Sequence, residues 1–386
     1  MHAIINARVF DVRQGEVIEN CTVLIHKGKI AEVGPDVTVP EGCAVTDAGG
    51  ANLLPGLIDA HCHLGLFEDG MGFEGDDGNE MTDPVTPELR AIDGINPMDR
   101  GFSEAIAGGV TAVCTGPGSA NVIGGQFATL KTAGRQVDAM VLQAPAAMKT
   151  AFGENPKRVY NDKKQAPMTR MAIAAKLRET LLLAGEYRDR KRTDDTDKLP
   201  GYSFKYEALL PVLSGDLAVK AHAHRADDIQ TAIRVAREFG LKLTLDHCTE
   251  GHLMTEALVE AGYPVIVGPH LTTRSKIELK ALDFKTPGIL SQAGIKTAIM
   301  TDHPVIPIQH LNLCAALSVK AGMEEWEALR AITLHAAEIL EVSDRIGAIE
   351  PGLDADLVLW RGHPFAWDSE VLQVWVDGVE AYKSDK

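Results

Sequence analysis

The 386-residue sequence predicts an α/β protein, a (β/α)8 TIM barrel with a small β-sandwich domain formed by both termini. Between residues 54 and 344, apolar strand-like runs alternate with longer helical patterns, as in a parallel sheet with helical crossovers. Residues 1–53 and 345–386 instead contain short strands and turns. Because one or two isolated hairpins are only marginally stable, we expect the two ends to meet in one composite β domain.

The terminal segments each contain several strand candidates. In the N-terminal segment they are residues 3–9, 22–26, 30–33 and 44–47, with a turn at Lys27-Gly28-Lys29. In the C-terminal segment they are residues 357–360 and 371–376, followed by Asp377-Gly378, a typical hairpin turn. Because both ends contain short strands and turns, we expect the domain boundaries after residue 53 and before residue 345.

The barrel is expected to contain seven clear strands and one weaker candidate. The clear candidates are residues 56–60, 110–114, 146–152, 217–221, 242–246, 264–267 and 296–300, and the weaker one is residues 126–132. Eight such strands with their helices close into a barrel. Residues 169–187 have the pattern of a long amphipathic helix, and the highly charged residues 188–198 are expected to be a solvated surface excursion.

The charge balance and the cysteines limit the possible partners. The chain has 38 Lys+Arg against 54 Asp+Glu, whereas nucleic acids and anionic membranes attract concentrated positive charge. No apolar run is long enough to cross a bilayer, and the first ten residues lack the apolar centre of a signal peptide. The six cysteines form no CxxC pair. We therefore expect a cytoplasmic homo-oligomer that acts on a small-molecule substrate, without nucleic-acid or membrane partners.

Histidine and aspartate side chains follow the ends of several barrel strands, where the functional groups of such barrels lie. His61 and His63 are two residues apart, so on a strand they point to the same side and can bind one ion together. His222, His247 and Asp302 lie at the ends of three further strands. Since imidazole and carboxylate are the usual ligands of zinc and similar ions, these residues indicate a divalent-metal site.

The segments around these residues resemble the amidohydrolase superfamily, and most closely its imidazolonepropionase-like and dipeptidase-like branch. The segments that carry the resemblance are residues 54–63 (LPGLIDAHCH), 222–224 (HAH), 246–247 (DH), 301–302 (TD) and 347–358 (GAIEPGLDADLV). The similarity covers nearly the whole chain. It implies the barrel and composite β domain already expected, and it implies metal ligands at His61, His63, His222, His247 and Asp302.

Two assignments stay open at this point. Either His222 or His224 could be the strand-five ligand, but the family places its ligand first, so His222 is assigned and His224 is expected beside the substrate. The centre could hold one ion or two, and a carboxylated Lys149 could bridge a pair, because a lysine on an apolar strand is costly unless its charge is used or removed. Glu154 is the rival bridging group, and a lysine that pairs at the barrel rim fits Lys149 equally well.

The predicted activity is metal-dependent hydrolysis of a C–N bond in an amide, a cyclic amide or a dipeptide-like small molecule. Zinc is the favoured ion, with manganese or iron as alternatives, and it would lower the pKa of a bound water toward ~7. By the resemblance, Asp302 would be the catalytic base that accepts the proton of this water. Arg225, His270 and Arg274 are expected to contact the substrate.

Two other functions are compatible with this fold. A deaminase of the same superfamily often carries a glutamate two residues after the strand-five histidine, but His224 occupies that position here. A barrel that has lost its metal could act as a binding or scaffold protein. The intact set of histidines and Asp302 argues against such a loss.

Overall fold

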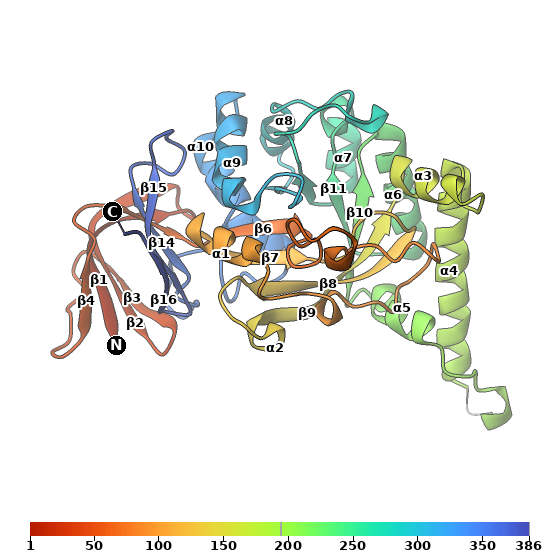
Figure 1. Ribbon diagram of the computed structural model, residues 1–386, viewed down its shortest axis with the longest axis horizontal. Coiled ribbons are helices and arrows are strands. Elements are labelled where there is room, and N and C mark those ends of the chain that lie inside the picture. Colours follow the sequence, from red (N-terminus) through yellow and green to blue (C-terminus); the bar gives the residue numbers. More distant parts are fainter. Residues whose placement is uncertain (194, 386) are drawn as a thin grey trace.

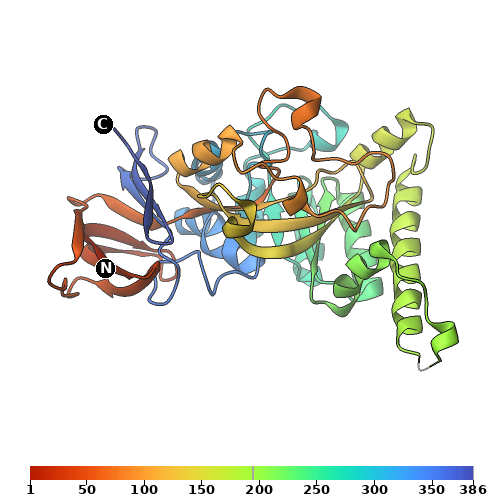
Figure 2. The ribbon, with the colours of Figure 1, turned by 60° about the horizontal axis from the view of Figure 1, so that its bottom comes forward.

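The computed structural model describes residues 1–193 and 195–385, and two sheets occupy different parts of the molecule. A sheet built from both ends of the chain lies at one end, and the long helix α4 (Arg170–Lys191) lies at the other (Figure 1). The N and C termini lie at the same end in both views (Figure 2). The predicted fold class is confirmed.

Strands from both termini form the first sheet. They are β1 (His2–Asp11), β2 (Glu16–His26), β3 (Lys29–Gly34), β4 (Ala44–Asp47), β5 (Asn52–Pro55), β14 (Leu357–Arg361), β15 (Glu370–Val376) and β16 (Val379–Lys383). Their order is β16-β15-β14-β5-β1-β2-β3, and β4 pairs with β1. The antiparallel pairing of β5 with β14 joins the two ends of the chain, so the N-terminal contribution extends through Pro55.

The second sheet forms the barrel, and its strands follow one another in chain order. They are β6 (Leu57–Cys62), β7 (Val110–Thr115), β8 (Ile123–Lys131), β9 (Val141–Ala151), β10 (Ala218–Ala223), β11 (Leu243–His247), β12 (Val265–Val267) and β13 (Thr297–Ile299). Strands β9 to β13 are parallel to one another, and β6 is parallel to β7. Strand β13 lies near β6, so the barrel is nearly closed.

Strand β8 departs from the expected run of parallel strands, because it is antiparallel to both β7 and β9. The reason lies in its connections. A parallel neighbour needs a crossover of a dozen or more residues, whereas residues 116–122 before β8 and the short α2 (Val137–Met140) after it form tight returns. The strand expected at residues 126–132 is therefore present, but it runs in the opposite direction.

Helices pack around the barrel strands; for example, α6 contacts β10 and β11, and α11 contacts β6 and β13. Besides α2 and α4, the described α-helices are α1 (Arg100–Ala107), α3 (Glu154–Asp162), α5 (Phe204–Ser214), α6 (Ala226–Phe239), α7 (Thr255–Ala261), α8 (Thr286–Gln292), α9 (Leu311–Lys320), α10 (Glu325–Ala331) and α11 (Leu334–Ile339). Even α4, with 22 residues, carries many charged side chains, and none of the described helices has the apolar length that a membrane crossing requires.

Helix α4 matches the helix expected at residues 169–187. Its N-cap is Thr169, whose side chain accepts a hydrogen bond from the Ala172 N–H at 3.1 Å. The helix also takes in the first residues of the charged run 188–198. The described residues of this run after the helix are mostly exposed, as expected for a surface segment, and residue 194 lies outside the described residues.

A buried lysine joins the barrel to the terminal sheet. Lys131, the last residue of β8, is 4% exposed, and its Nζ lies 2.6 Å from Asp356 Oδ2. The same atom lies 3.2 Å from a carboxylate oxygen of Asp354 and of Asp377. Burial lowers the pKa of Lys131, but the three carboxylates outweigh it, so the net shift is upward and the side chain stays charged. The conspicuous C-terminal sequence motif thus contributes two of the acids that hold the sheets together.

Replacing Lys131 with Met should destabilise the protein by roughly 3–5 kcal/mol, because it leaves the buried Asp356 carboxylate without its cation. The midpoint of urea denaturation measures the loss. Lys29→Met is the matched control, since Lys29 also pairs with Asp354, at 2.7 Å, but its side chain is half exposed. That control should cost about 1 kcal/mol or less. Equally small losses in both variants would contradict the role of Lys131 as the joint.

Candidate metal centre

Strand β6 delivers His61 and His63 to the end of the barrel. His61 is fully buried, and its Nδ1–H donates to Asp246 Oδ2 at 2.6 Å. His63 follows the strand directly, and its Nδ1–H donates to the Gly116 carbonyl oxygen at 2.7 Å. These hydrogen bonds leave the Nε2 atom of each ring for another partner. The Nε2 atom of His61 lies 3.5 Å from Asp302 Oδ1, and that of His63 lies 3.3 Å from the same oxygen.

Asp302 follows β13 and is held in the left-handed region, with a φ of 55°. The residue before it is fixed by Asp59, which accepts hydrogen bonds from the backbone N–H of Thr301 at 3.0 Å and from its hydroxyl at 2.5 Å. Burial raises the pKa of Asp302, but the neighbouring histidines, His247 first, outweigh it, so the net shift is well below the usual range. The Oδ1 atom of Asp302 has no hydrogen-bond partner among the described residues.

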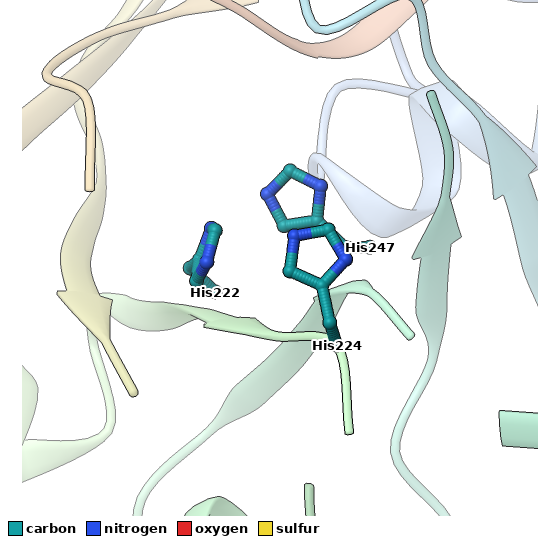
Figure 3. Close-up of side chains that lie close together, drawn as sticks. All are labelled: His222, His224 and His247. Carbon is teal, nitrogen blue, oxygen red and sulfur yellow. The ribbon is translucent and has the colours of Figure 1, made fainter. Parts of the chain in front are cut away.

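His222, His224 and His247 form a second group (Figure 3). His247 also lies close to His61 and Asp302, so the two groups are adjacent. The ring of His224 stacks on that of His247 with centroids 4.3 Å apart, and both meet the His222 ring edge-on. His224 Nδ1 lies 2.7 Å from the Thr249 hydroxyl, and His247 Nδ1–H donates to the Gly268 carbonyl oxygen at 2.9 Å. Neither ring nitrogen of His222 has a partner in the part of the chain that the structure describes.

Burial holds these histidines in the neutral form. It lowers the pKa of His61 to about 4, with the nearby Lys149 adding to the effect. It lowers the pKa of His224 to about 3, with His222 adding to the effect, and it also lowers the pKa of His222 and His247. A neutral imidazole keeps a free lone pair on one nitrogen, which is the form that binds a metal ion.

The structure distinguishes the two candidates for a bridging group by position. Lys149 lies on β9 with no exposed surface, and its Nζ is 3.4 Å from His61 Nε2. Burial lowers the pKa of Lys149 to about 8, against the opposing effect of Asp246 and Asp302. Glu154 begins α3 and lines a separate cavity. Lys149, and not Glu154, therefore lies beside the histidines.

The basic residues expected to contact the substrate lie elsewhere. Arg225 is the residue before α6, and its guanidinium pairs with both carboxylate oxygens of Asp227, at 2.9 and 3.0 Å. Arg274 Nη2 donates to a backbone carbonyl at 2.7 Å. His270 is buried against Phe284. None of these three side chains lines the cavity at the histidines, so their positions give no support to a role in substrate contact, whereas His224 does line it.

A cavity of about 340 Å³ opens over the two groups of donors. Its walls include Phe67, Asn79, Ser119, Asn155, Lys276 and Pro269. Sequence patterns missed one buried acid beside the histidines, Glu278, whose Oε1 lies 3.8 Å from Nε2 of both His222 and His224. It belongs to the short 3-10 helix η5 (Ile277–Leu279) in the loop after β12, and its place in such a loop is the one signal that could have suggested it.

The donor atoms fit a divalent metal ion. Two sets of residues could each hold such an ion. One set is His61, His247 and Asp302, and the other is His222, His224 and His247. Buried polar atoms without partners are rare in folded proteins, yet both nitrogens of His222 and one oxygen of Asp302 are of this kind. Nitrogen and oxygen donors of this type suit zinc and also manganese or iron.

A barrel whose strand ends bring histidines and carboxylates together around one cavity is the arrangement of the barrel hydrolases. The family model described as "Amidohydrolase family" matches residues 52–381. The chain belongs to this family, and it is a hydrolase that acts on C–N bonds. Members of the family generally bind divalent metals and act on small molecules.

Individual relatives agree with this assignment. The chain is 31% identical over 391 residues to amidohydrolase tasK of Hapsidospora irregularis, and the match covers 93% of this chain but 40% of that protein. It is 25% identical over 407 residues to an imidazolonepropionase of Cupriavidus necator, covering 91% of this chain and 87% of the relative. A crystal structure of an amidohydrolase from Thermotoga maritima MSB8 is 43% identical, with a TM-score of 0.96 and 100% of both chains covered.

The double variant His61→Ala, His63→Ala should lose the metal ion that these two side chains hold, because it removes two donors from one side of the centre. Even changes outside the ligand shell cost about 10- to 100-fold in affinity, so the loss should be at least roughly 100-fold. Elemental analysis of the purified, folded protein measures it. His270→Ala is the control, since this buried histidine does not line the cavity. Unchanged metal content in the double variant would refute the assignment.

Proposed function

We propose that this protein is a metal-dependent amidohydrolase that cleaves a C–N bond in an amide, a cyclic amide or a dipeptide-like small molecule. The observation that carries the proposal is the Oδ1 atom of Asp302, an unpartnered oxygen that faces Nε2 of His61 and His63 at the cavity. The similarity to an imidazolonepropionase supports a cyclic amide as one substrate class. A cavity of about 340 Å³ suits a small molecule.

The donor groups would hold one or two divalent ions, with zinc favoured over manganese or iron. A bound ion lowers the pKa of a water molecule and polarises the scissile carbonyl group. Lys149 would contribute as a carboxylated side chain, because only an uncharged amine can take up carbon dioxide. A pKa near 8 gives Lys149 a larger uncharged fraction at neutral pH than an exposed lysine has.

Asp302 would act as the general base and then as the general acid. It accepts a proton from the attacking water and later donates it to the leaving nitrogen. Asp246 and Gly116 hold the rings of His61 and His63 by their Nδ1–H groups, which keeps both Nε2 atoms directed at the centre.

We also retain the proposal of a cytoplasmic homo-oligomer. The net charge of −16 supports the expectation that nucleic acid and anionic membranes are not partners. Size-exclusion chromatography with light scattering measures the assembly directly.

Asp302→Asn should preserve the fold and lower turnover by roughly 10² to 10⁴, because an amide can offer an oxygen to a metal but cannot accept a proton near neutral pH. A screen of amides, cyclic amides and dipeptides identifies the substrate, and steady-state kinetics then compare the variant with the wild type. Metal content and thermal melting serve as controls on the variant. Native turnover in Asp302→Asn would show that another group activates the water.

A further inference from the structure

Glu278 is a buried acid whose Oε1 atom has no hydrogen-bond partner among the described residues. Its side chain is 1% exposed, although it comes from the loop after β12 and not from a strand. One of its oxygens, Oε1, points at the group of three histidines and lies 3.8 Å from Nε2 of both His222 and His224. A buried carboxylate oxygen is costly unless it has a hydrogen-bond donor or a cation.

The other oxygen of Glu278 is held in place by the start of α3. Oε2 accepts a hydrogen bond from the Glu154 N–H at 3.1 Å. Gly153, with a φ of 85°, permits this close approach, because a Cβ there would stand 3.2 Å from Oε2. The carboxylate is therefore anchored on one side, and its free oxygen is presented to the histidines.

No other described group satisfies Oε1 of Glu278. The nearest cation is Lys276, whose Nζ lies 3.8 Å away and instead donates to Asn155 Oδ1 at 2.8 Å. The free oxygen thus faces ring nitrogens that are themselves in need of a partner.

The three histidines present matching vacant nitrogens. Hydrogen bonds to Thr249 and Gly268 use Nδ1 of His224 and of His247, and they leave Nε2 of each ring available. His222 has no partner on either nitrogen within the described ranges. Nitrogen donors of the three rings lie within 4.8 Å of one another. Donors around one tetrahedral zinc ion lie about 3.4 Å apart, so small side-chain rotations would bring these groups onto one ion.

We propose that Glu278 and His224 join His222 and His247 as ligands of a second divalent ion, separate from the ion expected at His61, His63 and Asp302. The inference rests on the proposed metal-dependent function and deepens it. It assigns His224 to the metal instead of the substrate. It also gives the second ion a carboxylate from a loop, which holds η5 and the start of α3 against the centre.

Metal titration of the chelator-treated full-length protein tests the inference. Co²⁺ is the probe, with its visible absorption spectrum and elemental analysis as the two measurements. The wild type should bind two ions per chain. Glu278→Gln and His224→Asn should each weaken binding of the ion at His222 and His247 by at least roughly tenfold, and they should leave binding of the ion at His61 and His63 unchanged. The double variant His61→Ala, His63→Ala should weaken binding of the ion at His61 and His63 instead.

Glu154→Gln is the matched control, because Glu154 contacts the backbone of Glu278 while its side chain lines a separate cavity. It should bind both ions with wild-type affinity. If Glu278→Gln does not fold, as judged by thermal melting, Glu278→Asp replaces it, since this change keeps the charge but withdraws the oxygens by one methylene. The same selective loss is then expected.

Three results would overturn the inference, and they separate it from the proposed function. Two ions bound with wild-type affinity in both Glu278→Gln and His224→Asn would exclude these residues as ligands. A single ion in the wild type that depends on His61 and His63 but not on Glu278 would remove the second site and leave the proposed function intact. No bound ion in the wild type would remove both.

Discussion

The carboxylate of Asp246 is the group on which the arrangement of the centre depends. It is fully buried at the end of β11, where its Oδ2 accepts from His61 Nδ1–H at 2.6 Å and lies 3.2 Å from Lys220 Nζ. Its Oδ1 accepts from the Thr244 hydroxyl at 2.9 Å. Burial raises the pKa of Asp246, but Lys220 and His61 outweigh it and shift it downward, so the acid is ionised. This single charge fixes the tautomer of His61 and balances a buried lysine.

Strand β8 explains how the barrel interior tolerates two buried lysines. Lys149 and Lys220 are direct neighbours on the paired strands β9 and β10, and neither is more than 1% exposed. The antiparallel β8 places Phe127 in the barrel, and both ammonium groups lie over its ring, at 5.5 and 5.6 Å from the centroid. Each cation–π contact is favourable by about 2 kcal/mol when water is excluded. Phe127 therefore places an aromatic ring beneath both lysines.

The sequence predicted those parts of the centre that depend on strand periodicity. His61 and His63 share a side because strand residues alternate, and the same spacing relates His222 to His224. It could not predict Glu278, because a loop residue has no periodic relation to the strands it meets. Position next to a site residue in the sequence was also a poor guide to position in space in one case. Arg225 follows His224 but precedes α6, where pairing with a helix acid turns its side chain away.

The same limit applies to the fold. The strand segments were predictable from their apolar runs, but a run of apolar residues has no direction, and only the connections made β8 antiparallel. The choice between Lys149 and Glu154 was likewise a matter of which residue lies on the strand and which begins the next helix. The joint at Lys131 was hidden because its three acids lie more than 220 residues away along the chain.

Charge balance links the buried lysines to the number of ions that the centre can hold. Asp246 is committed to Lys220 and His61, so it cannot also neutralise a metal ion. Asp302 remains for an ion at His61 and His63. A second divalent ion beside Lys149 and three neutral rings would add two positive charges to a buried site, where uncompensated charge is expensive. Glu278 supplies an additional carboxylate at that place, and a carboxylated Lys149 would replace a positive charge with a negative one, so the two together would make a second ion electrostatically acceptable.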